Sequence, residues 1–264
     1  MIAGMPSLRI ALSQPTASGD PQSNARCVRL LMHRAAANGA RLVVFPEGHL
    51  SGYAKEQVAD WSDVDWSVVR DELDSITALA GELGLWVVLG SAHPLSPPRL
   101  PHNSCYVISD AGEVVHRYDK RVCSSTEVTR YYTPGRSAVV FDVDGYTFGI
   151  AVCIEVNFPH LFEEYERLGV DCVLLPAYPV DAVFRTKAQA LAAIYNYWIG
   201  VCSVAQTRHL FSSEVFGPDG RSVAGLDPQA GLVLADLDRD DPALSVAWRR
   251  ARPWRARARM AADG

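Results

Sequence analysis

Residues 41–47 read RLVVFPE, an apolar run that stops at Pro46 and is followed by the carboxylate of Glu47. An unbroken run of this kind is typical of a strand that is buried on both faces of a sheet. Working outward, helical apolar patterns lie on either side of it, at 24–38 and 69–83, and glycines end both. The stretch therefore predicts a buried strand within an α/β arrangement.

The same alternation of strands and helices continues along the chain. We expect further strands at 8–12, 85–90, 172–175 and 197–205, helices at 161–168 and 186–196, and hairpins at 105–118, 139–152 and 215–237. This order indicates a mixed sheet with helices on its faces. The periodicity is equally compatible with a three-layer domain and with half of a four-layer sandwich. No repeat or linker divides the sequence, so one domain over residues 1–264 is expected.

Composition excludes some classes of function. The net charge of −5 argues against a nucleic-acid platform, which needs clustered positive charge. A basic tail at about 248–264 is the exception, and we interpret it as a solvated or subunit-contacting segment. No apolar run reaches the ~18 residues of a membrane span, and the N-terminus does not resemble a signal peptide. Six scattered cysteines without a CxxC pair suggest reduced thiols in a cytoplasmic protein.

Cys153 stands where the apolar run 146–152 gives way to a helical pattern. A thiol on such a strand-to-helix turn lies at the rim of the sheet, near backbone N–H groups that can hold an oxyanion. A helix N-terminus also lowers the pKa of a thiol. Cys123, which is close to Lys120, is the competing candidate. The position favours Cys153 as a nucleophile.

Two charged residues also follow predicted strands. Glu47 sits at a bend between Pro46 and Gly48, where a carboxylate can act as general base and then as general acid. Lys120 follows EVVHRY (113–118), and its ammonium could stabilise charge that develops during acyl transfer. Ligands of α/β sheets gather beyond the carboxyl ends of the strands. The sequence thus allows both side chains to share a crevice with the thiol.

Taken in order, these segments resemble the nitrilase, or carbon–nitrogen hydrolase, superfamily. The matching stretches are RLVVFPEGHLSGY (41–53), HRYDKRV (116–122), EVTRYYTPG (127–135), YTFGIAVCIEVNFP (146–159), GVDCVLLPA (169–177) and FGPDG (216–220). The resemblance implies an α/β fold arranged as a four-layer α-β-β-α sandwich. It also implies a Glu-Lys-Cys triad, which maps onto Glu47, Lys120 and Cys153, and a second, substrate-positioning glutamate, which maps onto Glu127.

The resemblance further implies a cysteine-dependent hydrolase of non-peptide C–N bonds. We expect an amidase that releases ammonia from a small carboxamide through a thioester, with Lys120 and the backbone N–H of Ile154 holding the oxyanion. N-carbamoyl amidohydrolase, nitrilase and acyltransferase activities remain alternatives, as does a ligand-binding member without turnover. No metal or organic cofactor is needed, and no nucleic-acid or membrane partner is expected. Family members usually assemble, which suggests a homodimer or larger homo-oligomer.

Two departures from the family pattern bear on the substrate. His160 follows Pro159, where many members have a glutamate and then an arginine, and Tyr178 stands where a tryptophan is common. Ile154 occupies the place of a tryptophan that marks the nitrile-specific branch. The first two differences leave the triad intact but separate the substrate question from the family pattern, whereas HLSGY (49–53) and Ile154 are more similar to the amidase branches.

Overall fold

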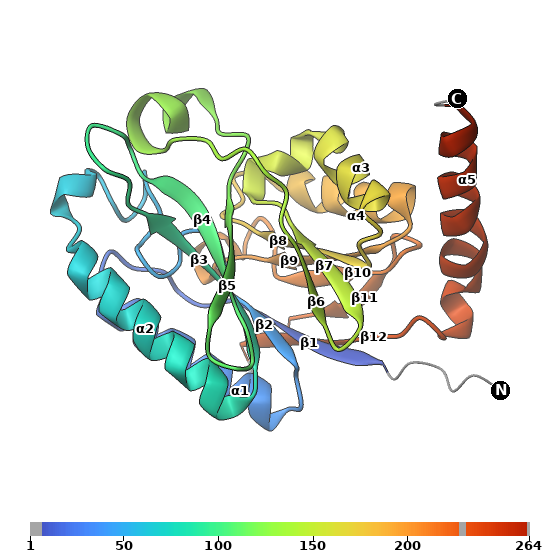
Figure 1. Ribbon diagram of the computed structural model, residues 1–264, viewed down its shortest axis with the longest axis horizontal. Coiled ribbons are helices and arrows are strands. Elements are labelled where there is room, and N and C mark those ends of the chain that lie inside the picture. The colour runs from blue at the N-terminus through green and yellow to red at the C-terminus, as the bar shows by residue number, and fades with distance from the viewer. Residues whose placement is uncertain (1–6, 227–230, 263–264) are drawn as a thin grey trace.

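The computed structural model describes residues 7–226 and 231–262, and it contains two six-stranded sheets packed face to face (Figure 1). Helices α1 (Pro21–Ala37) and α2 (Trp66–Leu83) cover the outer face of the first sheet. Helices α3 (Pro159–Arg167) and α4 (Val183–Tyr195) cover the outer face of the second. The result is the four-layer α-β-β-α sandwich that the sequence resemblance implies.

Each sheet has a parallel centre and antiparallel edges. The first has the order β12 (Leu232–Leu237), β1 (Leu8–Ser13), β2 (Leu42–Val44), β3 (Trp86–His93), β4 (His102–Ile108), β5 (Val114–Asp119). The second has the order β11 (Ser222–Gly225), β10 (Glu214–Phe216), β9 (Trp198–Cys202), β8 (Cys172–Pro176), β7 (Tyr146–Ile150), β6 (Val140–Val143). Strands β1, β2 and β3 run parallel, as do β7, β8 and β9.

Strand β2 shows why its sequence is apolar throughout. Leu42 and Val44 belong to the core between the two sheets, whereas Val43 and Phe45 pack against the helices of the outer layer. Alternate side chains of a strand point to opposite faces, so a strand covered on both sides has no polar position. The strand predicted from residues 41–45 is confirmed, with bounds shortened to 42–44.

The helices of the first layer begin and end at recognisable signals. The carboxylate of Asp20 accepts hydrogen bonds from the backbone N–H groups of Gln22 and Ser23 at the start of α1, which satisfies donors that the helix leaves free. Asp65 caps α2 in the same way, and Gly84 ends α2 with a φ of 57°, a conformation that glycine adopts at little cost.

The hairpin predicted at 215–237 is wrong. Strand β10 pairs with the short strand β11, and residues 232–237 cross to the other sheet, where β12 pairs antiparallel with β1. The loop residues 227–230 lie outside the described part of the chain. A local pattern of two strands and a turn does not fix which neighbour each strand takes, because pairing partners are chosen by the core they share.

The basic tail forms a helical segment at Ser245–Ala251 and then helix α5 (Arg252–Ala262), at the edge of the molecule (Figure 1). Ion pairs tie it to α3 and to the start of β8: Arg255 and Arg259 bind Glu166, and Arg252 binds Asp171, which also pairs with Arg239 from the segment before the tail. Part of the basic charge predicted to face solvent or another subunit is therefore neutralised within the chain. Across the described residues, no helix has the combined length and hydropathy needed to cross a membrane.

Candidate active site

A cavity of about 200 Å³ opens where the strands of the two sheets end. Its walls include Lys120, Glu127, Cys153 and Ile154, together with Tyr53, Lys55, Ser124, Asn157, Val180, Asp181, Phe184 and Lys187. Glu47 is fully buried behind this wall and contacts Lys120. The structure thus brings together all five residues that the sequence singles out.

Lys120 is held between two carboxylates. Its Nζ donates to Oε1 of Glu47 and to Oε1 of Glu127, each at 2.8 Å, and its side chain is only 1% exposed. Burial alone would lower the pKa of Lys120, but the charges of Glu47 and Glu127, with the nearby sulfur of Cys153, hold that pKa well above its ordinary value. The site therefore carries a fixed ammonium that cannot easily move or lose its proton.

Glu127 is fixed from the opposite side as well. Its Oε2 accepts the backbone N–H of Ser124 at 2.6 Å. Burial would raise the pKa of its carboxyl, but the charge and hydrogen bond of Lys120 and the backbone bond from Ser124 leave it below the ordinary value. This glutamate is thus an ionised neighbour of the cavity.

Cys153 occupies a strained turn. It begins the helical segment Cys153–Asn157, with two residues between it and the end of β7, and has a φ of 50°, a left-handed conformation that is uncommon for residues other than glycine. Its Sγ lies 3.6 Å from the carbonyl oxygen of Tyr178. The turn places the thiol in the wall of the cavity, at the margin of the core between the sheets.

The lowered pKa expected for this thiol is wrong. The pKa of Cys153 is raised well above its ordinary value, mainly by burial and next by the charge of Glu47. The charge of Lys120 opposes this shift only in part. The helical segment is one short turn, so little dipole is available to stabilise a thiolate. The resting residue is a thiol that needs a base.

Two contacts that position Glu47 were not anticipated from the sequence. The side-chain amide of Asn103 donates to Oε1 of Glu47 at 2.8 Å, and the backbone N–H of Tyr178 donates to Oε2 at 3.0 Å. Asn103 lies on β4, in line with core residues such as Cys105. A polar residue on the buried face of a strand was the one available signal.

Glu155 lies two residues after the thiol and is a further site residue, which the sequence analysis does not predict. Its Oε1 accepts the backbone N–H groups of Arg121 and Val122, at 2.7 and 3.0 Å. Its Oε2 accepts the N–H of Val152 at 2.6 Å and the hydroxyl of Tyr118 at 2.7 Å. One buried carboxylate thereby joins the turn that carries the thiol to the strand end that carries the lysine.

Cys123, the competing candidate, is placed differently. It does not line the cavity, its Sγ lies 3.9 Å from the carbonyl oxygen of Lys120, and burial raises the pKa of its thiol to about 12. Within the described residues, no three His, Cys, Asp or Glu side chains are grouped as ligands of a metal ion would be.

Comparisons with known proteins agree on one family. The carbon–nitrogen hydrolase family model matches residues 9–244. "Hydrolase Rv0480c" of Mycobacterium tuberculosis is 29% identical, over 89% of this chain and 91% of the relative. Human omega-amidase NIT2 is 23% identical, over 89% of this chain and 90% of its own. An amidase from Nesterenkonia sp. has the same fold, with a TM-score of 0.79 at 24% identity, over 96% of this chain and 97% of that one. Because the family model spans most of the sequence, the chain belongs to the carbon–nitrogen hydrolase family, the nitrilase superfamily, and is an enzyme that acts on C–N bonds.

Proposed function

We propose that this enzyme is an amidase that uses Cys153 as its nucleophile and releases ammonia from a small carboxamide. The observation that carries the proposal is the buried ammonium of Lys120, which is held at 2.8 Å by each of two carboxylates beside a thiol in one cavity. Such an arrangement supplies a nucleophile, a base and a fixed positive charge within one site.

The chemistry divides into two acyl-transfer steps. Glu47 takes the thiol proton as the sulfur of Cys153 attacks the amide carbon. Lys120 and the backbone N–H of Ile154 stabilise the oxyanion; the first N–H groups of a helical segment have no partner inside it. Glu47 returns its proton to the departing nitrogen, and ammonia leaves a thioester on the sulfur. Water, deprotonated by Glu47, then attacks the thioester and releases the carboxylic acid and the thiol.

Glu127 has a supporting role in this proposal. Its carboxylate fixes Lys120 from the side opposite Glu47, so that the ammonium keeps its position while Glu47 exchanges a proton. Glu127 also faces the cavity, where it can accept a hydrogen bond from the N–H₂ group of an amide.

The cavity limits the size of the substrate. A space of about 200 Å³ is below the range of ≈300–1,000 Å³ typical of sites for drug-sized ligands. We therefore propose a carboxamide with a short acyl chain. Variants of the Nesterenkonia amidase were solved with acrylamide and with butyramide, and these amides are suitable first probes.

The test is product release from a panel of amides, N-carbamoyl compounds and nitriles. The proposal expects ammonia from short carboxamides, a mass increase of Cys153 equal to the acyl group, and loss of both with Cys153→Ala. Cys123→Ala, which changes the neighbouring thiol outside the cavity, should retain activity. Loss of turnover with Cys123→Ala alone would overturn the assignment. Carbon dioxide release with the N-carbamoyl compounds alone would identify a carbamoylase instead.

Three further features complete the proposal. We propose that residues 1–264 form one catalytic domain, that the enzyme needs no metal or organic cofactor, and that it works in the cytoplasm, where its six free cysteines would stay reduced. We also propose a homodimer or larger homo-oligomer, supported by exposed apolar side chains on α4: Val183 is 56% exposed and Ile194 is 50% exposed.

A further inference from the structure

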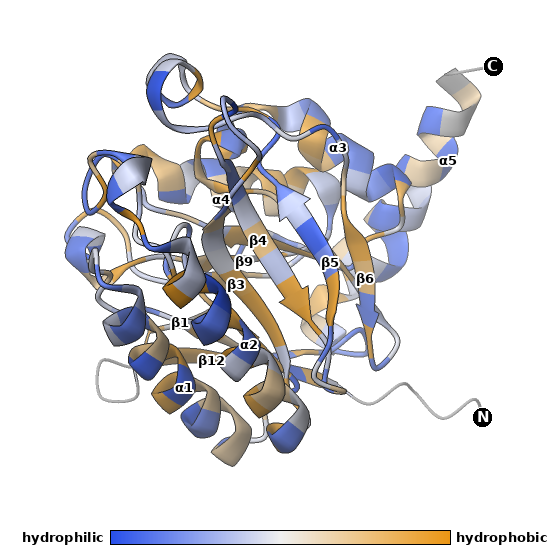
Figure 2. Ribbon diagram, turned by 60° about the vertical axis from the view of Figure 1, so that its left-hand side comes forward, coloured by the Kyte–Doolittle hydropathy of each residue, from blue (hydrophilic) through white to orange (hydrophobic). Residues whose placement is uncertain are grey.

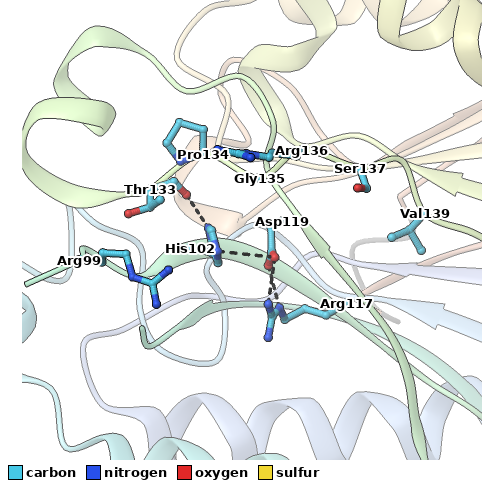
Figure 3. Close-up of a pocket in the computed structure, with 10 residues that line it drawn as sticks. All are labelled: Arg99, His102, Arg117, Asp119, Thr133, Pro134, Gly135, Arg136, Ser137 and Val139. Atoms are coloured by element: carbon cyan, nitrogen blue, oxygen red, sulfur yellow. Dashed lines mark hydrogen bonds and ion pairs between the residues drawn. The ribbon is translucent and has the colours of Figure 1, made fainter. Parts of the chain in front are cut away.

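A second cavity, of about 660 Å³, lies on the outer face of strands β4 and β5 (Figure 3). Alternate residues of a strand point to opposite faces, so Arg117 and Asp119 face this cavity, while Tyr118 faces the core between the sheets and Lys120 faces the active site. The wall is made by Arg99, His102, Arg117, Asp119, Thr133, Pro134, Gly135, Arg136, Ser137 and Val139. Figure 2 shows that β5 turns hydrophilic toward its C-terminal end.

The charges of this wall are unbalanced. Arg117 is fully engaged: Nε and Nη2 bind Asp119 at 2.8 and 3.0 Å, and Nη1 lies 2.6 Å from Nε2 of His93. Burial would raise the pKa of Asp119, but hydrogen bonds from Arg117 and Ser104 hold it below its ordinary value, so this pair is ionic and neutral overall. The remaining two arginines in the wall, Arg99 and Arg136, carry no such compensation.

Within the described residues, neither Arg99 nor Arg136 has a carboxylate partner. Both are exposed, so their positive charge faces the cavity and the solvent. In a chain whose net charge is −5, two uncompensated guanidinium groups in one concave wall are a local reversal of sign. Arginine presents a planar set of donors that matches carboxylate and phosphate oxygens.

The two segments that carry these arginines are joined to each other. The backbone N–H of Thr133 donates to the carbonyl of Pro101 at 2.8 Å, and its hydroxyl donates to the carbonyl of Leu100 at 2.7 Å. Nδ1 of His102 donates to the carbonyl of Thr133 at 2.6 Å, since a carbonyl can only accept (Figure 3). These bonds fix the spacing between the backbones of the two segments, so less ordering is needed when a ligand binds.

We propose that this cavity is a binding site for a small organic anion with at least two negatively charged groups. Arg99 and Arg136 would each bind one charged group of the ligand, and Pro134 and Val139 give the wall an apolar part for its carbon skeleton. The volume lies within the range of small-molecule sites. The shared chemistry is that of di- or tricarboxylates and of phosphate esters.

The site is separate from the amide site but shares backbone with it. The N–H of Gly135 donates to the carbonyl of Lys120 at 2.8 Å, and the N–H of Lys120 donates to the carbonyl of Asn103. Neighbouring residues at the end of β5 thus line different cavities, Asp119 the anion cavity and Lys120 the amide site, and an anion in the first leaves the second open. Binding of the anion therefore does not depend on the proposed amidase activity.

The experiment is calorimetric titration of the full chain, at low salt, with citrate as a carboxylate probe and pyrophosphate as a phosphate probe. We expect saturable binding of at least one, and at least tenfold weaker binding by Arg99→Gln/Arg136→Gln. The matched control is Arg26→Gln/Arg70→Gln, which removes the same charge from exposed positions on α1 and α2 and should bind like the wild-type protein. Wild-type protein alkylated at Cys153 should also bind the anion unchanged.

The outcomes separate the sources of the ligand. Binding of citrate alone points to carboxylates, and binding of pyrophosphate alone points to phosphate esters. If both probes bind with dissociation constants weaker than about 10 mM, the proposal is overturned. Equal weakening in the control pair would overturn it too, because the effect would then be one of net charge. If the double variant fails to fold, the single variants Arg99→Gln and Arg136→Gln give the same comparison.

Discussion

At the scale of single residues, the active site keeps its sulfur protonated and its lysine charged. Burial and Glu47 raise the pKa of Cys153, whereas Glu47 and Glu127 raise the pKa of Lys120 against its burial. The negative charge of Glu47 contributes to both shifts, while burial adds to the shift of the thiol and opposes that of the ammonium. A thiol and an ammonium are therefore the favoured pair at neutral pH, and in the proposed mechanism the carboxylate of Glu47 removes the thiol proton during attack.

The protonation state of Cys153 can be measured directly. Because its folded-state pKa is raised, the thiolate should form only above the ordinary thiol value of 9.0. At neutral pH, the wild-type protein and the Cys153→Ala variant should therefore have nearly the same ultraviolet thiolate absorbance. Glu47→Gln removes a charge that raises this pKa, so it should move the titration to lower pH. A thiolate signal at neutral pH that disappears with Cys153→Ala, but not with Cys123→Ala, would contradict this account.

How far the sequence predicts the site depends on what each residue contacts. Glu47 and Cys153 follow apolar runs and Lys120 follows a strand-like stretch, so the ends of predicted strands mark all three. Asn103 acts through a hydrogen bond to Glu47, which is 56 positions away in the sequence. No local sequence pattern predicts such a contact. The thiol pKa was mispredicted because burial, which outweighs a short helical turn, is a property of the folded molecule.

At the scale of elements, Glu155 joins the segment Cys153–Asn157 to the end of β5. Its carboxylate accepts four hydrogen bonds, three of them from backbone N–H groups. A glutamine at position 155 would replace one of these acceptor oxygens by an N–H₂ group, which would face the N–H or O–H donors that now bind it. This buried group therefore helps to hold the thiol and the lysine at a fixed distance.

Glu155→Gln should therefore impair both stability and catalysis. Loss of buried hydrogen bonds to a charged group costs roughly 1.5–3 kcal/mol, which corresponds to about 3–12 °C in the melting temperature of a chain of this size. Turnover should fall more than substrate affinity, because the geometry of the reacting groups is altered. The control is Glu163→Gln on α3, where the carboxylate is 38% exposed and pairs with Arg167. A melting temperature unchanged in both variants would show that Glu155 is not a structural link.

Most helices and strands can be predicted from the sequence. The exceptions are strands that do not pair with the strand next to them in the sequence. Strand β2 was found because its apolar run is continuous. Strand β11 was missed because its side chains are mostly exposed, so it has no apolar periodicity. The following apolar run was then assigned to β10, although in the structure β12 completes the first sheet beside β1.

At the scale of the whole molecule, the two outer helical layers differ. Most apolar residues of α1 and α2 pack against the first sheet, and the two helices also pack against each other. Helix α4 instead presents Val183, Lys187, Ala190 and Ile194 along one side, at helical spacing. A hollow of about 320 Å³ lies over part of this side, between α4 and the start of α3. An apolar face of this kind is typical of a surface that another subunit covers.

The assembly can be tested at this face. We expect the wild-type chain to run as a dimer or larger species in light scattering, and Ile194→Glu to shift it toward the monomer, because a buried unpaired carboxylate at an interface costs several kcal/mol. The matched control is Leu30→Glu on α1, whose side chain is 52% exposed against 50% for Ile194; it should leave the mass unchanged. Both variants should keep the melting behaviour of a folded chain, since both positions are half exposed. A wild-type monomer, or an oligomer that Ile194→Glu leaves intact, would place the subunit contact elsewhere or remove it, and the exposed side of α4 would then need another explanation.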